Sequence, residues 1–267
     1  MKLSRESITN AFDLRKIKKL VIQCIVSEDK INDIRETIGS YSNSFKLLYE
    51  ITESDESNID GLLINLDNLN VENLIAIEKY LISSKRSKEI ILDLSGINKS
   101  RDNHDLILSF INRYDIDIIK GTKEEVSSLI KGQCFNSALL EDKYRDFSRK
   151  NDTILIIQDN DYWITDGYSE FTIDIEENLI IDKSFKDILT SLIVVTTALC
   201  DTKEQRIEAI LLAITIFEIS KKLALKKSEV DESEIDIKKC LTQEIEYLNS
   251  ENIYKLSTIG YRFKRLL

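Results

Sequence analysis

Polar and charged side chains stand beside short apolar runs at several places in this sequence. The residues at these positions that could take part in chemistry are Asp93, Lys120, Gln158 and Asp187. Carboxylates can bind a metal ion or accept a proton, and an ammonium group can bind a phosphate. Ligands of doubly wound α/β sheets bind beyond the carboxyl ends of the strands, so residues at these ends are the first candidates for a binding site.

Each candidate also has a purely structural interpretation. Asp93 could cap a helix or a turn. Thr122 and Glu125, three residues apart, match a capping box, which local chemistry alone favours. Asp187 precedes an apolar helix that begins at Ile188, and an acidic residue there interacts favourably with the helix dipole. The residues by themselves leave both interpretations open.

The chain has 267 residues, no proline and only seven glycines. Because glycine adopts positive φ at low cost, Gly-rich loops are the usual way to bring backbone N–H groups to a phosphate. A genome rich in A and T explains the low average, since glycine and proline codons are GC-rich. A nucleotide-binding protein of this composition must place each glycine well or has lost such a loop. Gly96, Gly121 and Gly167 stand where turns are expected.

Short apolar runs alternate with stretches of helical periodicity, which predicts a parallel sheet covered by helices. The expected strands, buried on both faces, are Leu20 to Val26, Gly61 to Leu66, Ile90 to Leu94, Ile116 to Ile119 and Ile154 to Ile157. Asp166-Gly167 between two aromatic-containing runs predicts a hairpin, and therefore an antiparallel edge. From Ile188 onward the chain is expected to be helical, with Lys226 to Lys239 as a solvated connection.

Composition limits the partners and the compartment. The net charge of -10 disfavours binding to nucleic acid and to anionic membrane surfaces. The four cysteines show no C-x-x-C spacing, which predicts reduced thiols in the cytosol. No signal peptide is evident, and the longest apolar run, Ile188 to Cys200, is short for a membrane span, so a core helix is expected. The single histidine, His104, indicates no metal site, and Trp163 indicates packing.

Five segments, taken in order, resemble the hydroxyethylthiazole kinases. They are Leu20 to Ser27, Asn58 to Leu69, Ile90 to Ile97, Ile118 to Val126 and Ile157 to Gly167. The resemblance covers nearly the whole chain and implies one domain over residues 1–267 with a ribokinase-like fold. That fold is a three-layer α/β/α arrangement with a mostly parallel central sheet and an antiparallel edge hairpin. The implied reaction is phosphorylation of 4-methyl-5-(2-hydroxyethyl)thiazole by ATP with Mg²⁺, in thiamine salvage. The protein is expected to be cytoplasmic and to form a homotrimer or another homo-oligomer.

The resemblance also implies roles for individual residues. Asp93 and Glu125, which would organise the metal and the phosphates, match the family's strand-end aspartate and the glutamate that binds metal through water. Lys120 matches an arginine near the nucleotide phosphates, and it keeps the charge but not the bidentate geometry. Gln158 replaces a threonine beside the nucleotide. Ile31 corresponds to a methionine that touches the thiazole.

The largest departure from the family lies before the long apolar helix. The family's "GTGC" matches Ser184-Phe185-Lys186-Asp187, so both glycines of the anion hole are replaced. Asp187 would then act as the base toward the substrate hydroxyl, and Lys183 or Lys186 would supply cations in place of backbone N–H groups.

Two hypotheses about function therefore stand side by side. The first is an active kinase with Asp187 as its base. The second is a catalytically inactive homologue that acts as a binding, sensor or structural subunit. The altered positions that separate them are Gln158, Asp159, Ser184 and Lys186.

Overall fold

The computed structural model describes residues 6, 8–9, 20–41, 45–48, 59–67, 71–83, 89–99, 101–131, 133, 139–174, 185–230, 236–256 and 261–265. The chain divides into two compact units. The first comprises residues 1–22, 28–47 and 176–259, and the second comprises residues 23–27, 48–175 and 260–267. The single domain expected from the sequence stays a prediction.

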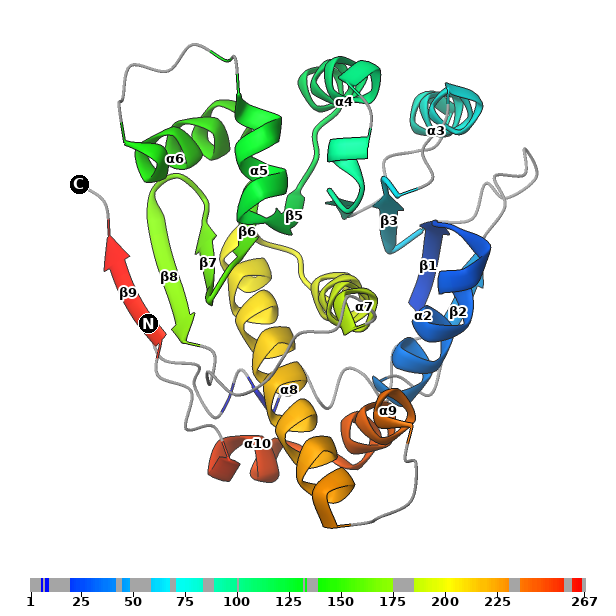
Figure 1. The fold of residues 1–267 in the computed structure, drawn as a ribbon, viewed down its shortest axis with the longest axis vertical. Coiled ribbons are helices and arrows are strands. Elements are labelled where there is room, and N and C mark those ends of the chain that lie inside the picture. The colour runs from blue at the N-terminus through cyan, green and yellow to red at the C-terminus, as the bar shows by residue number, and fades with distance from the viewer. Residues whose placement is uncertain are drawn as a thin grey trace. The chain divides into compact units, whose positions relative to one another are not determined.

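The second unit contains strands that lie side by side in chain order (Figure 1). They are β3 (Gly61–Asn65), β4 (Ile90–Asp93), β5 (Ile118–Thr122), β6 (Ile154–Gln158), β7 (Asp161–Thr165), β8 (Ser169–Asp174) and β9 (Tyr261–Arg265). Neighbours from β3 to β6 pair in parallel, and neighbours from β6 to β9 pair antiparallel. The predicted α/β fold with an antiparallel edge is confirmed, and β9 extends that edge beyond the expected hairpin.

Burial explains why these strands could be recognised in the sequence. Every residue of β3, β4 and β6 is buried, and their side chains are apolar on both faces except for the last residue of each strand, Asn65, Asp93 and Gln158. In β7, Tyr162 and Ile164 are fully buried while Trp163 between them is half-buried, as expected for alternating faces. Strand β5 runs further than predicted, so that Lys120 and Gly121 lie within the strand.

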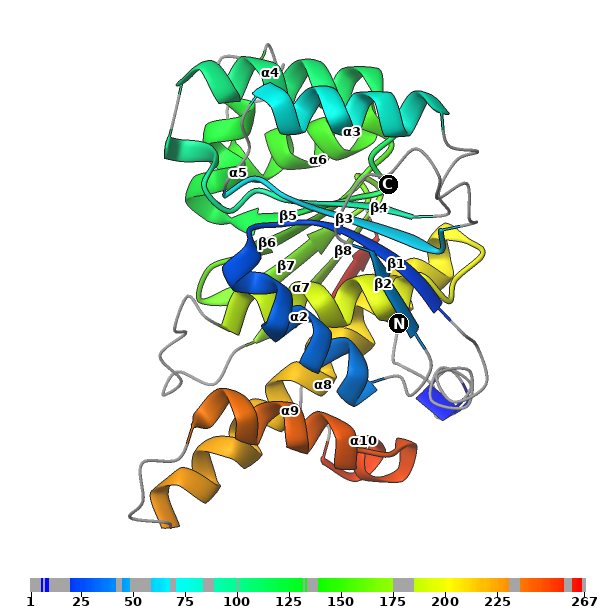
Figure 2. The ribbon, with the colours of Figure 1, turned by 90° about the vertical axis from the view of Figure 1, so that its right-hand side faces the viewer.

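Helices of the second unit cover one face of these strands (Figure 2). They are α3 (Val71–Ser83), α4 (Arg101–Arg113), α5 (Lys123–Ile130) and α6 (Leu140–Asn151), with a 3₁₀ turn η1 (Ile97–Lys99) before α4. Helix α5 buries Val126 and Leu129, and α6 buries Tyr144 and Phe147. These apolar side chains fix the start of α5 near the ends of β5 and β6.

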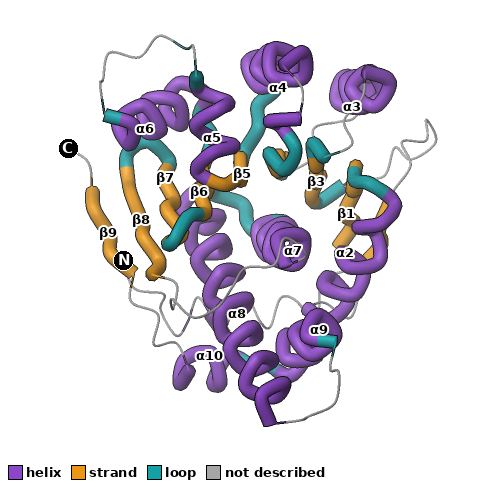
Figure 3. Tube along the Cα trace, viewed as in Figure 1, coloured by secondary structure: helices purple, strands orange, loops and turns teal. Residues whose placement is uncertain are grey.

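The first unit is mainly helical (Figure 3). Its helices are α2 (Glu28–Tyr41), α7 (Phe185–Thr197), α8 (Lys203–Val230), α9 (Ile237–Tyr247) and α10 (Ser250–Leu256). Helix α7 packs against α2 and α8, and α9 packs against the same two helices. Strand β2 (Phe45–Leu48) lies almost wholly in this unit, whereas β1 (Leu20–Ile25) is divided between the two units.

Of the two expectations for the helical region, the core helix is present and the long connection after it is shorter than expected. All residues of α7 from Asp187 to Thr197 are buried, which confirms a core helix in this apolar run. The predicted connection from Lys226 to Lys239 was wrong at both ends, because α8 continues to Val230 and α9 begins at Ile237. None of the described helices combines the length and the apolar character that crossing a membrane requires.

Candidate functional site

A buried ion pair joins the end of β4 to the middle of β5 in the second unit. Asp93 is the last residue of β4, and the parallel register sets it beside Lys120 of β5. The Lys120 Nζ lies 3.1 Å from the Asp93 Oδ2, and the two side chains are 2% and 0% exposed. The structure thus brings two of the predicted site residues into direct contact, and each provides the other's counter-charge.

The other carboxylate oxygen of Asp93 accepts two hydrogen bonds from Ser95. The Ser95 backbone N–H donates to Oδ1 at 3.0 Å, and its hydroxyl donates to the same atom at 2.6 Å. Both oxygens of Asp93 therefore accept from protein donors, as a buried carboxylate requires. Ser95 was missed in the sequence, although its position two residues after an aspartate is typical of such a turn.

Glu125 takes part in a capping box at the start of α5. Its backbone N–H donates to the Thr122 hydroxyl at 3.2 Å, and its Oε2 accepts from the Thr122 backbone N–H at 2.7 Å. The structural interpretation of this pair is confirmed. The cap places the half-buried Glu125 side chain at the carboxyl end of β5.

Gln158 and Asp159 follow in the next strand and turn. Gln158 ends β6 as the register partner of Thr122, and its amide donates to the Tyr162 hydroxyl at 3.4 Å. Asp159 is half-exposed and pairs with Lys123 across 3.1 Å. The structure therefore gathers Asp93, Lys120, Glu125 and Gln158 along one end of β4, β5 and β6.

The remaining predicted residues belong to the first unit. Asp187 is the third residue of α7 and is 9% exposed, and the Lys30 Nζ of α2 lies 3.3 Å from its Oδ1. Lys186 is half-buried, and so is Ile31, the neighbour of Lys30 in α2. The structure thus holds the predicted base in an ion pair within the first unit.

Helix α7 begins at Phe185 and not at Ile188 as expected, so Phe185, Lys186 and Asp187 of the altered segment belong to the helix. Ser184 and Lys183 lie outside the described residues. Lys30 was missed as a partner of Asp187, because no spacing in the sequence connects two charged residues that meet only when α2 packs on α7.

A magnesium ion fits only part of the predicted metal site. Within the described ranges, no three His, Cys, Asp or Glu side chains are grouped to bind a metal ion. Protein-bound Mg²⁺ usually keeps several waters and uses one or two carboxylates, so a smaller set can suffice. Asp93 does not fit as a direct ligand, because Ser95 and Lys120 donate to its two oxygens. Glu125 fits a contact through water.

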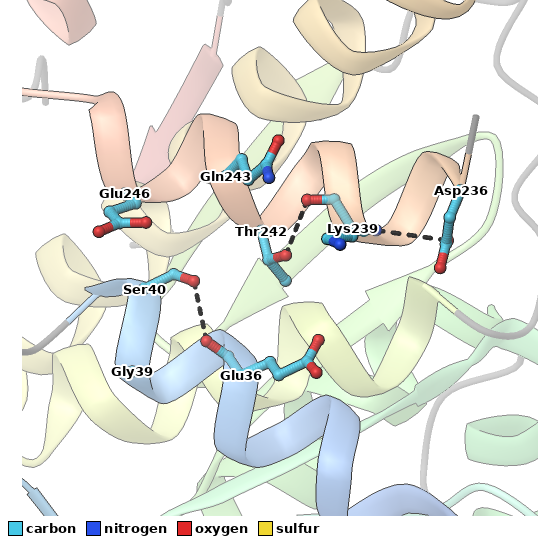
Figure 4. Close-up of a pocket in the computed structure, with 8 residues that line it drawn as sticks. All are labelled: Glu36, Gly39, Ser40, Asp236, Lys239, Thr242, Gln243 and Glu246. Atoms are coloured by element: carbon cyan, nitrogen blue, oxygen red, sulfur yellow. Dashed lines mark hydrogen bonds between the residues drawn. The ribbon is translucent and has the colours of Figure 1, made fainter. Parts of the chain in front are cut away.

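The first unit also has a polar groove of about 400 Å³ beside α2 and α9 (Figure 4). Its charged lining side chains are Glu36, Asp236, Lys239 and Glu246. The hydrogen bonds drawn in Figure 4 each stay within one helix or its cap, such as that from the Ser40 hydroxyl to the Glu36 carbonyl at 2.8 Å. These bonds stabilise each helix separately and point to no ligand.

The chain is similar in sequence to one kind of enzyme over part of its length. No family model matches the sequence. A hydroxyethylthiazole kinase of Finegoldia magna is 30% identical over 112 residues, which are 41% of this chain and 42% of that protein. The match thus spans about two fifths of the length of this curated relative.

Solved structures are similar over nearly the whole chain. A hydroxyethylthiazole kinase of Pyrococcus horikoshii OT3 superposes with a TM-score of 0.76 at 16% identity and covers 97% of this chain and 100% of its own. A ribokinase-like superfamily protein of Enterococcus faecalis has a TM-score of 0.60 at 11% identity, covering 94% of each chain. The Staphylococcus aureus pyridoxal kinase in complex with pyridoxal has a TM-score of 0.59 at 10% identity, covering 93% of this chain and 99% of its own.

The order of the strands agrees with the fold that the sequence comparison and the structural comparison both indicate. Together they confirm the resemblance to the hydroxyethylthiazole kinases, in sequence over part of the chain and in its ribokinase-like fold over nearly all of it.

Proposed function

We propose that this chain is an ATP-dependent kinase that phosphorylates the hydroxyethyl group of a thiazole alcohol, 4-methyl-5-(2-hydroxyethyl)thiazole, and so serves thiamine salvage. The observation that carries the proposal is the environment of Asp187. Its carboxylate is buried in the first turn of α7 and is held by the ammonium group of Lys30 at 3.3 Å. A carboxylate fixed in this way is suited to accept a proton from an alcohol.

The contact with Lys30 prepares the side chain for this role. The Lys30 Nζ lies 3.3 Å from the Asp187 Oδ1, and this charge-assisted contact fixes the orientation of the carboxylate. Asp187 would therefore remove the hydroxyl proton as the oxygen attacks the γ-phosphate, and the half-buried Ile31 beside Lys30 would contact the thiazole ring.

The strand ends of the second unit would serve the nucleotide. Lys120 would supply positive charge for the phosphates, with Asp93 as its counter-ion in the unliganded protein. Gln158 would contact the nucleotide through its amide, and Glu125 would hold Mg²⁺ through water. The ion, when bound, neutralises charge on the phosphates. Phosphoryl transfer depends mainly on such positioning and electrostatic stabilisation, so a side-chain cation such as Lys186 would partly replace an anion hole.

A second candidate function is ligand binding without turnover, by a sensor or a structural subunit. The contact between Lys120 and Asp93 favours it, because the ammonium group is engaged within the protein. Phe185 and Lys186, the first two residues of α7, also have larger side chains than the Thr and Gly that the family sequence has at these positions. For either function we propose a cytoplasmic homo-oligomer, a trimer as in the family that the chain resembles.

The test is a coupled assay of ADP release with Mg²⁺, ATP and the thiazole alcohol, with pyridoxal as a second acceptor. We expect turnover with the thiazole alcohol, and we expect Asp187→Asn to lower kcat by about 100- to 10,000-fold, the usual contribution of a general base. The matched control is Asp33→Asn, since Asp33 of α2 also pairs with a lysine, Lys238, at 2.5 Å. Its kcat should stay within about twofold of the unmodified protein.

The outcomes distinguish the two candidates. Turnover that survives Asp187→Asn would disprove the role of this base. Absence of turnover together with a thermal shift on adding ATP or the thiazole alcohol would favour the binding protein. Absence of both signals would overturn both proposals. Thermal denaturation of each variant checks that the substitution has not unfolded the protein.

A further inference from the structure

A cavity of about 320 Å³ lies in the second unit and has no assigned role. Side chains from α5, α6, β7 and the turn after β6 line it, and those that bear on its chemistry are Lys123, Glu141, Tyr144, Asp159, Asp161 and Trp163. None of them is a residue to which the proposed kinase reaction gives a task. The volume is at the small end of the range for ligand pockets, roughly 300 to 1,000 Å³.

Two aromatic rings form part of the lining. The Tyr144 and Trp163 ring centroids are 5.7 Å apart, with the ring planes tilted by 49°. Tyr144 is buried, and its hydroxyl shares a 2.6 Å hydrogen bond with the Ser127 hydroxyl, which fixes the ring. Burial raises the pKa of Tyr144, so it stays a neutral phenol at physiological pH. The lining of the cavity therefore includes two aromatic rings, and the orientation of the Tyr144 ring is fixed.

Trp163 already contacts one cation of the protein. The Arg145 guanidinium carbon lies 6.0 Å from the Trp163 ring centroid, a distance typical of a cation–π contact. Arg145 also pairs with Asp142 and Glu170, which neutralise its charge. The environment of Trp163 is thus compatible with positive charge, and Arg145 adds no net positive charge there.

Acidic side chains outnumber basic ones in the lining. Lys123 is the basic lining residue, and its Nζ lies 3.1 Å from an oxygen of Asp159. The hydrogen bond that the Lys123 ammonium donates to Asp159 raises the pKa of Lys123, so this pair is formally neutral at physiological pH. The carboxylates of Glu141 and Asp161 then give the lining an excess of negative charge.

We infer that this cavity binds a small planar aromatic cation. The rings of Tyr144 and Trp163 supply apolar and cation–π contact, and the excess charge of Glu141 and Asp161 favours a positive ligand. The same charge repels aromatic anions, and a neutral ring of equal size loses the electrostatic part of the attraction. The ligand class is therefore one aromatic ring that carries an amidinium, an ammonium or a quaternised ring nitrogen.

Tryptophan fluorescence can test the inference directly, because Trp163 is the single tryptophan of the chain. The probes are benzamidinium, benzamide and benzoate, which share a size and differ in charge. We expect a saturable change in Trp163 emission with benzamidinium at a Kd below roughly 1 mM, as is usual for a ligand of so few atoms. Benzamide and benzoate should bind at least about tenfold more weakly.

The second part of the test removes a negative charge from the lining of the cavity. Glu141→Gln should weaken benzamidinium binding by about three- to fivefold, the effect of one partly exposed charge, and leave benzamide binding unchanged. The matched control is Glu204→Gln, because Glu204 also stands in the first turn of a helix, α8, but does not line the cavity. The control should bind benzamidinium like the unmodified protein.

Either of two results would overturn the inference. One is an equal affinity for benzamidinium and benzamide, or emission that changes linearly without saturation. The other is an equal loss of affinity in Glu141→Gln and Glu204→Gln. Unchanged emission maxima and unfolding midpoints of the unliganded variants show that they are folded. The inference does not depend on kinase activity, so Asp187→Asn should bind benzamidinium normally.

Discussion

The ion pair between Lys120 of β5 and Asp93 of β4 is almost fully buried. Removing two charges from water is costly, and the Coulomb attraction at 3.1 Å together with the Ser95 hydrogen bonds offsets that cost. The pair is therefore stable only while both partners are present. A phosphate that recruited Lys120 would have to compete with Asp93 for the same ammonium group.

Lys120→Met should lower the free energy of unfolding by about 3 to 5 kcal/mol, because it leaves the buried Asp93 carboxylate without a counter-charge. Urea denaturation measures the change. The double variant Lys120→Met with Asp93→Asn removes the isolated charge and should recover a large part of the loss. A single variant as stable as the unmodified protein would contradict the account of the pair.

Burial also raises the pKa of the Cys24 thiol in β1. The thiol of the unfolded chain ionises near pH 8.5, whereas the folded protein keeps its proton above that pH. The unfolded state therefore binds fewer protons, and the stabilisation that Cys24 provides below pH 8.5 is lost as the pH rises further. The expected slope approaches about 1.4 kcal/mol per pH unit above pH 9. Cys24→Ala should remove this slope in denaturation curves between pH 8 and 9.5, and parallel pH profiles would contradict the prediction.

Among the secondary-structure elements, the turn after β4 and strand β5 each contain a glycine, Gly96 and Gly121, and a side chain would be tolerated differently at the two positions. Gly96 follows β4 with φ of +85°, and a Cβ there would lie 2.6 Å from the Asp67 Oδ1 and 2.8 Å from the Asp67 Cα. Gly121 lies within β5, where a Cβ would lie 3.1 Å from the Leu94 Cβ. The turn after β4 therefore requires glycine for both its conformation and its space.

Gly96→Ala should destabilise the protein by about 1 to 3 kcal/mol, the usual cost of a side chain in a left-handed conformation. Gly121→Ala should cost less, since the Leu94 side chain has only to move by a few tenths of an ångström. Differential scanning calorimetry of the two variants gives the comparison. The reverse order of stability would show that the conformation at Gly96 is not the limiting feature.

For the whole molecule, the charge of -10 sets the long-range interactions. A nucleic acid is itself densely negative, so the interaction between net charges opposes association at low ionic strength and is screened as salt is added. A fluorescently labelled DNA duplex should therefore show no saturable change in anisotropy with this protein at 50 mM salt. Binding that weakens with added salt would reveal a basic surface that the net charge does not indicate.

Much of the fold follows from the burial of apolar segments and could be predicted from the sequence. Strands β3, β4 and β6 are buried throughout, so all their residues before the polar one that ends each strand are apolar or glycine. Strand β9 could not be found in this way, because its sequence Tyr-Arg-Phe-Lys-Arg forms a strand only by pairing with β8. The end of β5 was missed since Lys120 and Thr122 are polar residues in a strand.

The amino-acid sequence alone determined which segments become buried strands and which residues stand at their ends, because apolar periodicity reports burial locally. It named Asp93, Lys120, Glu125 and Asp187 as candidates, with the capping box as an alternative for Glu125. Only the tertiary structure decided which charges meet. Parallel register sets Lys120 against Asp93, and helix packing sets Lys30 against Asp187, between residues that no local spacing connects.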